Sequence, residues 1–299
     1  MSLLVVGSIA LDDVESPAGR VEDALGGATC YFAVAAQYFT QVRAVGVVGD
    51  DFPAEHLDFL AARGIDIAGI AREPGRSFRW GGRYHESLND RDTLFTELGV
   101  FEAFDPTLPE SYLDSEYVFL ANIHPSLQQR VLEQAVRRRF VAMDTMNFWI
   151  EGTREELDHT LARVDALVIN DAEAHLLTGT TNLVHAARAI RSMGPETVII
   201  KRGEFGALLF DSQGIFAAPA FPLEEVRDPT GAGDTFAGGF MGALARAGSV
   251  DAASLRKAVI YGSAMASFCV ERFSLDRLRE LTRDEIESRF EAFYTLTRF

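Results

Sequence analysis

Short apolar runs rich in β-branched residues alternate along this chain with longer segments of helical periodicity. This alternation predicts a mostly parallel β-sheet covered by helices on both faces. In such open sheets the active site lies beyond the carboxyl ends of the strands. The expected strands are residues 3–7, 42–48, 117–121, 140–143, 166–169 and 197–200, and the expected helices between them include residues 127–139, 154–163 and 183–193.

Length and composition favour one soluble domain over residues 1–299. The chain is 47% hydrophobic, enough for a large core, and no linker or repeat divides it. A formal charge of −16 argues against a nucleic-acid partner. We expect a cytoplasmic protein without a membrane partner, because no targeting segment or long apolar run is present. Cys30 and Cys269 are interpreted as small buried hydrophobes.

Two segments interrupt the alternation, at about residues 11–24 and 76–100. Their alternating polar and apolar residues predict a small β lid over the site. Such a lid would exclude water from the reaction. Its open edge would also suit pairing with a second subunit, so a homodimer through the lid is a hypothesis.

The most informative motif is the glycine turn at residues 228–234, Asp-Pro-Thr-Gly-Ala-Gly-Asp, which leads into a helical pattern ending at Ala247. The N-terminus of a helix presents unpaired N–H groups and a partial positive charge, so it is a natural site for phosphate. Asp234 falls in the first turn, where a carboxylate can act as general base toward a hydroxyl. The alternative is that Asp234 only supports the first turn of a buried helix.

With this motif the chain resembles the ribokinase, or PfkB, family of carbohydrate kinases. The resemblance implies a ribokinase-like three-layer α/β fold with a small β lid. It also implies that the amides of Gly231, Ala232 and Gly233 form an anion hole and that Asp234 is the base. The Gly-x-x-x-x-Gly-Lys-Ser/Thr phosphate loop is absent from the sequence, which argues against a P-loop enzyme.

The resemblance extends to the N-terminal part of the chain. Asp12 follows the first apolar run, where the family binds substrate hydroxyls, and Gly26 and Gly27 are similar to the paired glycines beside the family's sugar site. Tyr31 stands where the family usually has Asn, which removes an amide expected near the substrate. The substrate class therefore stays open at this point.

Further motifs resemble the family's ATP and magnesium sites. Residues 170–173 match the Asn-x-x-Glu motif, which implies that Asn170 helps to bind nucleotide and that Glu173 holds Mg²⁺ through water. Lys201 and the turn from Gly203 to Gly206 match the strand and loop that approach ATP. Ser263 falls where the family lines its nucleotide pocket.

We therefore expect an ATP-dependent phosphotransferase that phosphorylates a primary hydroxyl of a small sugar or nucleoside. Aromatic residues of the lid slightly favour a nucleoside, because they could stack on a base. Ordinary packing of the lid is the alternative for these side chains, and a sugar kinase or a non-catalytic nucleotide-binding regulator remains an alternative for the chain. The lid aromatics are Phe78, Trp80, Tyr84 and Phe95.

Overall fold

The computed structural model describes residues 1–298, and its centre is a nine-stranded β-sheet. The strands β11 to β5 run parallel, whereas β12 and β13 pair antiparallel at one edge, so the predicted mostly parallel sheet is confirmed. In their order across the sheet, the strands are β13 (Gly214–Ala218), β12 (Ala207–Asp211), β11 (Thr197–Lys201), β10 (Ala166–Asn170), β9 (Phe140–Met143), β8 (Tyr117–Leu120), β1 (Ser2–Val6), β4 (Gln41–Val48) and β5 (Asp66–Arg72).

The central strands are apolar throughout because both faces of the sheet are covered. In β1, Leu3 and Val5 belong to one buried apolar cluster, while Leu4 and Val6 belong to a second cluster on the other face. Successive side chains of a strand point to opposite faces, so a strand between two cores must be continuously apolar. The short runs recognised in the sequence are therefore central strands.

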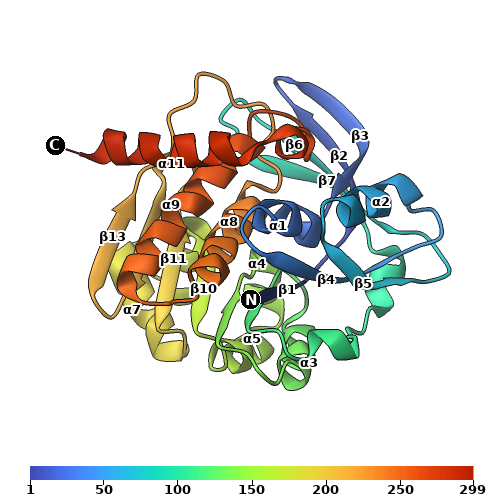
Figure 1. Ribbon diagram of the computed structural model, residues 1–299, viewed down its shortest axis with the longest axis horizontal. Helices are drawn as coiled ribbons and strands as arrows, with labels where there is room; N and C mark the ends of the chain where they lie inside the picture. The colour runs from blue at the N-terminus through green and yellow to red at the C-terminus, as the bar shows by residue number, and fades with distance from the viewer. Residues whose placement is uncertain (299) are drawn as a thin grey trace.

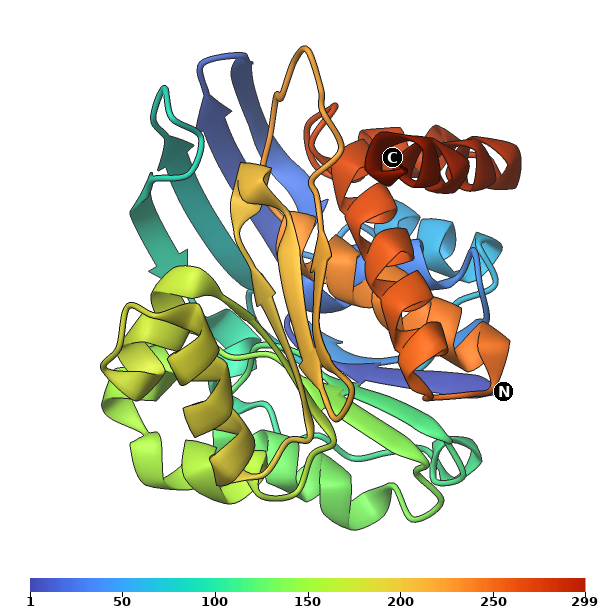
Figure 2. The same ribbon diagram turned by 90° about the vertical axis from the view of Figure 1, so that its left-hand side faces the viewer.

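Helices form a layer on each side of the sheet (Figure 2). None of them, within residues 1–298, combines the length and apolar character needed to cross a membrane. One layer contains α1 (Ala28–Ala36), α2 (Ala54–Ala62), α8 (Ala232–Ala247), α9 (Ala252–Cys269), α10 (Asp276–Glu280) and α11 (Arg283–Thr297). The other contains α3 (Pro125–Gln134), α4 (Asn147–Gly152), α5 (Arg154–Leu161), α6 (Asp171–Thr178) and α7 (Leu183–Met193), with short 3₁₀ turns η1 (Gly99–Ala103) and η2 (Glu110–Tyr112).

The helix expected over residues 127–139 is shorter than predicted. Helix α3 ends at Gln134, because Ala135 adopts a non-helical backbone with ψ of 89°. The Arg138 side chain then turns back and donates to the carbonyls of Leu132 and Ala135, at 2.9 and 2.7 Å. Arg138 therefore caps the C-terminus of α3 from outside the helix.

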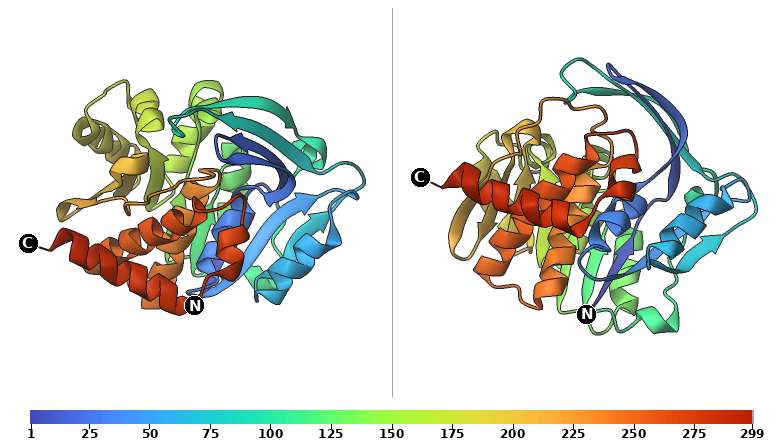
Figure 3. Two further views of the ribbon diagram at one scale, coloured as in Figure 1. Left: turned by 90° about the horizontal axis from the view of Figure 1, so that it is seen from above. Right: turned by 45° about the horizontal axis from the view of Figure 1, so that its top comes forward.

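A second, smaller sheet lies beside the main one, at the upper right of Figure 1. Figure 3 shows the hairpin of β6 and β7 extending from the side of β5 toward the middle of the molecule. We call this structure the small sheet. Its strands, in spatial order, are β3 (Gly19–Gly26), β2 (Ala10–Ser16), β6 (Phe78–Tyr84) and β7 (Arg91–Glu97), with only the β2–β6 pair parallel.

Candidate active site

Helix α8 begins behind a left-handed turn at Gly231, whose φ is +71°. This conformation favours glycine, and a Cβ there would lie 2.3 Å from the ring of Tyr31. The buried Asp228 carboxylate fixes the approach by accepting from the N–H groups of Thr230 and Ser274, at 2.8 and 2.9 Å. The turn is therefore held by Asp228 and packed against Tyr31.

The amides of this turn are not equivalent. The Ala232 N–H donates to the carbonyl of Pro229 at 3.2 Å, so it closes the turn. The N–H groups of Gly231 and Gly233 have no hydrogen-bond acceptor within residues 1–298. Free N–H groups at a helix N-terminus are suited to bind an anion. The expected anion hole of three amides therefore has two free donors in this structure.

Asp234 lies half-buried in the first turn of α8. Burial raises its pKa to about 6, while the positive charges of Lys201 and Arg91 act in the opposite direction and the charge of Glu173 adds to the increase. A carboxylate with a pKa near 6 is mostly ionised at neutral pH, yet it is basic enough to accept a proton from a hydroxyl in the transition state. The environment of Asp234 therefore fits a general base.

Lys201, at the end of β11, brings a cation to the start of α8. Its Nζ lies 2.7 Å from the position that a Cβ of Gly233 would occupy, so a side chain at residue 233 would displace the ammonium group. The turn η3 (Gly203–Phe205) follows, with φ of +52° at Gly203 and +84° at Gly206. The structure thus brings Lys201 and the glycine turn of α8 together.

Asn170 and Glu173 form a capping box at the start of α6. The Asn170 side chain accepts from the Glu173 N–H at 2.7 Å, and Glu173 Oε2 accepts from the Asn170 N–H at 3.0 Å. Burial raises the pKa of Glu173, opposed by the charges of Lys201 and Arg91. Because the box engages only one carboxylate oxygen, the other is available to a hydrated cation.

Asp144, which directly follows β9, joins these carboxylates. Its side chain is buried, and its Oδ1 has no hydrogen-bond partner within residues 1–298. Burial raises its pKa, and the charges of Asp234 and Glu173 add to the increase. The part of the chain described contains no group of three or more His, Cys, Asp or Glu side chains that could hold a metal directly. The unpartnered Oδ1 of Asp144 and the free carboxylate oxygen of Glu173 fit Mg²⁺ held through its waters.

Asp12, on β2, lies at the other end of the site. Gly26 is packed so closely against it that a Cβ would lie 1.9 Å from Asp12 Oδ2, and Gly27 has a φ of +87°. Burial raises the pKa of Asp12 to about 8; the Gly27 N–H opposes this by stabilising the charged form, while Asp234 adds to it. A carboxyl that is largely protonated at neutral pH can donate a hydrogen bond as well as accept one.

Predicted site residues from both halves of the chain thus converge, from Asp12 and Gly27 to Lys201 and Asp234. The position of Ser263 is defined only by its burial in α9, which packs along α8. A role for Ser263 in lining the nucleotide pocket stays a prediction.

The hairpin between β6 and β7 contributes residues that were not in the predicted site. The Thr230 hydroxyl donates to the Tyr84 hydroxyl at 3.2 Å, and Asn89 Oδ1 lies 3.0 Å from the Cβ position of Gly203. Arg91, at the start of β7, lies opposite Tyr84 in the β6–β7 pairing. The only sequence signal was that these polar residues lie in the expected lid.

The lid aromatics divide into two groups. Phe78 stacks on Phe101 at 5.3 Å, and the ring of Phe95 covers Gly81. Trp80 covers Gly82, and by strand alternation it shares a face with Tyr84, which meets the α8 turn. Packing therefore accounts for Phe78, while Phe95 lies on the face opposite to Trp80.

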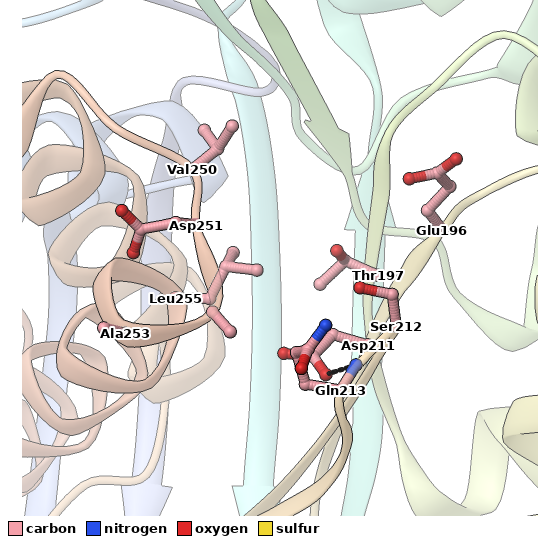
Figure 4. Close-up of a pocket in the computed structure, with 10 residues that line it drawn as sticks. Glu196, Thr197, Asp211, Ser212, Gln213, Val250, Asp251, Ala253 and Leu255 are labelled. Atoms are coloured by element: carbon pink, nitrogen blue, oxygen red, sulfur yellow. Dashed lines mark hydrogen bonds between the residues drawn. The ribbon is translucent and has the colours of Figure 1, made fainter.

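A pocket of about 550 Å³ lies away from this site (Figure 4). Thr197, at the beginning of β11, and Asp211, at the end of the antiparallel β12, line it together with Asp251 before α9. These positions mark the amino ends of the parallel strands, opposite to Lys201. The pocket is therefore not part of the candidate active site.

Comparison with known proteins agrees with this geometry. The chain is 34% identical over 254 residues to a cytidine kinase of Thermococcus kodakarensis, an alignment that covers 82% of this chain and 89% of the relative. Two solved structures share the fold, each with a TM-score of 0.78 and 21% identity. The nucleoside kinase of Methanocaldococcus jannaschii aligns over 97% of this chain and 98% of its own. A ribokinase II structure from E. coli, in complex with ATP and Mg²⁺, aligns over 97% of this chain and 99% of its own.

The model of the pfkB family of carbohydrate kinases matches residues 2–280, which is nearly the whole chain. The sequence resemblance is thereby confirmed, and with it the ribokinase-like fold. This chain belongs to the PfkB family of carbohydrate kinases, and it is a kinase.

Proposed function

We propose that this protein is an ATP-dependent nucleoside kinase that phosphorylates a primary hydroxyl, with Asp234 as the general base. The observation that carries the proposal is the position of Asp234. It combines a pKa near 6 with immediate proximity to two free helix amides and to the Lys201 ammonium group. A carboxylate used only to cap the helix would not require this cation beside the free amides.

In the proposed reaction, Asp234 takes the proton of the acceptor hydroxyl as its oxygen attacks the γ-phosphorus of ATP. The new P–O bond forms while the bond from phosphorus to the β,γ-bridging oxygen breaks, and ADP leaves with that oxygen. The amides of Gly231 and Gly233, with Lys201, stabilise negative charge on the transferring group. Asp12 binds hydroxyls of the acceptor and orients the one that reacts.

Magnesium is part of the proposal. The free oxygen of Glu173 and the unpartnered Oδ1 of Asp144 are the groups that would hold its waters. When bound, the ion would neutralise phosphate charge. The solved E. coli structure of this fold contains both ATP and Mg²⁺.

The choice of a nucleoside is supported by the names of the relatives and by Trp80, which shares the site-facing side of the small sheet with Tyr84. A sugar kinase is the second candidate, because Phe78 is used in packing and Phe95 lies on the opposite face. Tyr31 replaces the family's usual Asn and packs under Gly231, so neither substrate can use an amide side chain at this position.

The test is ADP release from ATP and magnesium across a panel of nucleosides, pentoses, hexoses and sugar phosphates, with Asp234→Asn as the blank. Turnover with nucleosides, absent from the blank, is the expected result. Turnover with sugars alone would replace the nucleoside proposal by the sugar kinase. Bound ATP without turnover on any acceptor would favour a non-catalytic regulator.

A homodimer through the small sheet and a cytoplasmic location complete the proposal. The outer strands β3 and β7 each pair with only one neighbour, so their free edges can accept another strand. Size-exclusion chromatography with light scattering measures the oligomeric state.

A further inference from the structure

Arg91 differs from the other arginines of the small sheet. Arg79 forms an ion pair with Asp23, and Arg83 pairs with Glu15 at 3.1 Å. Arg91 is exposed, and within residues 1–298 it forms no ion pair shorter than 4.0 Å. The hairpin therefore presents one guanidinium group whose charge is not neutralised by a carboxylate.

The position of this guanidinium is nevertheless defined. Its central carbon lies 5.3 Å from the centroid of the Trp80 ring, within the range of a cation–π contact. Arg91 also pairs across the hairpin with Tyr84, whose hydroxyl accepts from Thr230, the residue before Gly231. The aromatic ring thus holds the cation on the side of the small sheet that meets the glycine turn.

The tip of the same hairpin reaches the nucleotide side of the site. Asn89 Oδ1 lies 3.0 Å from the Cβ position of Gly203, in the turn that follows Lys201. The hairpin therefore touches both loops that were predicted to bind the phosphates. Arg91 follows Asn89 by two residues and pairs across the hairpin with Tyr84, so it lies next to both contacts.

The charge balance of the site shows what a cation here would do. Four acidic side chains converge, whereas Lys201 is the one cation among the predicted site residues. A transferring phosphoryl group adds further negative charge. The field of Arg91 already reaches this centre, because its charge lowers the pKa of both Asp234 and Glu173. The four acidic residues are Asp12, Asp144, Glu173 and Asp234.

We propose that Arg91 is a catalytic residue, whose guanidinium donates hydrogen bonds to the non-bridging oxygens of the phosphoryl group during transfer. This inference rests on the proposed kinase reaction and adds a residue to it. Arg91 is not consumed, and the bonds made and broken are those of the transfer described above. Because the small sheet carries Arg91, the guanidinium charge reaches the phosphoryl group only when this sheet lies over the site. Closure of the small sheet on the acceptor is therefore coupled to catalysis.

The test compares Arg91→Ala and Arg91→Lys with Arg83→Met. Arg83 is a matched control because it lies in the same hairpin but pairs with Glu15 of β2. With ATP, magnesium and the best acceptor of the panel, we expect kcat of Arg91→Ala to fall by about 100-fold or more while KM for the acceptor changes little. The lysine variant should retain more activity than the alanine variant. Guanidinium ions at millimolar concentration should restore part of kcat to Arg91→Ala and leave Arg83→Met unchanged.

Two results would overturn the proposal: a kcat of Arg91→Ala within threefold of the wild type, or a loss confined to KM. An equal loss in Arg83→Met, without rescue by guanidinium, would also overturn it, since the hairpin as a whole would then be responsible. These outcomes differ from failure of the proposed function, in which the wild-type protein itself would transfer no phosphate to any acceptor.

Discussion

Replacing Asp12 by Asn should stabilise the protein at neutral pH while impairing substrate binding. The Asp12 side chain is only 4% exposed, and burial raises its pKa from 3.8 to about 8. At pH 7 the folded protein therefore keeps a proton on this carboxyl group, whereas the unfolded chain releases it. An amide has almost the same shape and carries no charge, so it avoids this difference.

The magnitude follows from proton linkage. A group whose pKa is higher in the folded state contributes its full stability below the unfolded pKa, near 4, and loses it as the pH rises toward 8. Each pH unit in this window corresponds to roughly 1.4 kcal/mol. The wild type should therefore lose about 4 kcal/mol of unfolding free energy between pH 4 and pH 7 that Asp12→Asn retains.

Urea unfolding at pH 5, 6, 7 and 8 measures this difference. Asp13→Asn is the matched control, because Asp13 is the next residue of β2 and accepts from the Asp23 N–H at 2.9 Å instead of entering the site. The stability advantage of Asp12→Asn over the wild type should increase with pH, and the control should show no advantage. An advantage that stays constant from pH 5 to pH 8 would refute the assignment of a retained proton to Asp12.

Three other substitutions test the site. Asp234→Asn should keep ATP binding and lower kcat by about 10²- to 10⁴-fold, and activity near that of the wild type would exclude Asp234 as the base. In the wild type, kcat/KM should fall as the pH drops below about 6, because Asp234 becomes protonated. Glu173→Gln should raise the magnesium concentration needed for half-maximal rate, so an unchanged magnesium titration would contradict its role. Gly231→Ala should destabilise the fold by about 1 to 3 kcal/mol in urea unfolding, because its φ is +71° and the new Cβ would meet the ring of Tyr31. Gly179→Ala is the matched control, because Gly179 has a φ of +72° at an open position, and an equal loss there would show that packing against Tyr31 is unimportant.

The fold could be predicted largely from local patterns. A continuous apolar run such as residues 197–200 is recognisable without any neighbour, because a strand covered on both faces must be apolar at every position. Helix α7 was predicted with its observed limits, Leu183 and Met193, since its apolar face repeats with helical periodicity. The end of α3 was not, because the backbone at Ala135 leaves the helix without a local glycine or proline signal.

Long-range electrostatics could not be predicted in the same way. The motif at the start of α8 identified Asp234, but its pKa depends on Lys201 and Arg91, which lie 33 and 143 residues away in the sequence. Asp144 was not among the predicted site residues, and its place in the site follows from the adjacent ends of β9 and β10. These interactions exist only when separate strands end at the same edge of one sheet.

The sequence by itself determined the family, the parallel sheet, the glycine turn and the identity of the candidate base, because each depends on a short pattern or on a motif of adjacent residues. The tertiary structure decided that the Ala232 N–H donates to the Pro229 carbonyl, that Tyr31 packs under Gly231, and that the hairpin brings Arg91 to the glycine turn. The physical reason is that hydrogen bonding, steric contact and charge act over a few ångströms in space, whereas sequence patterns report only on neighbours along the chain.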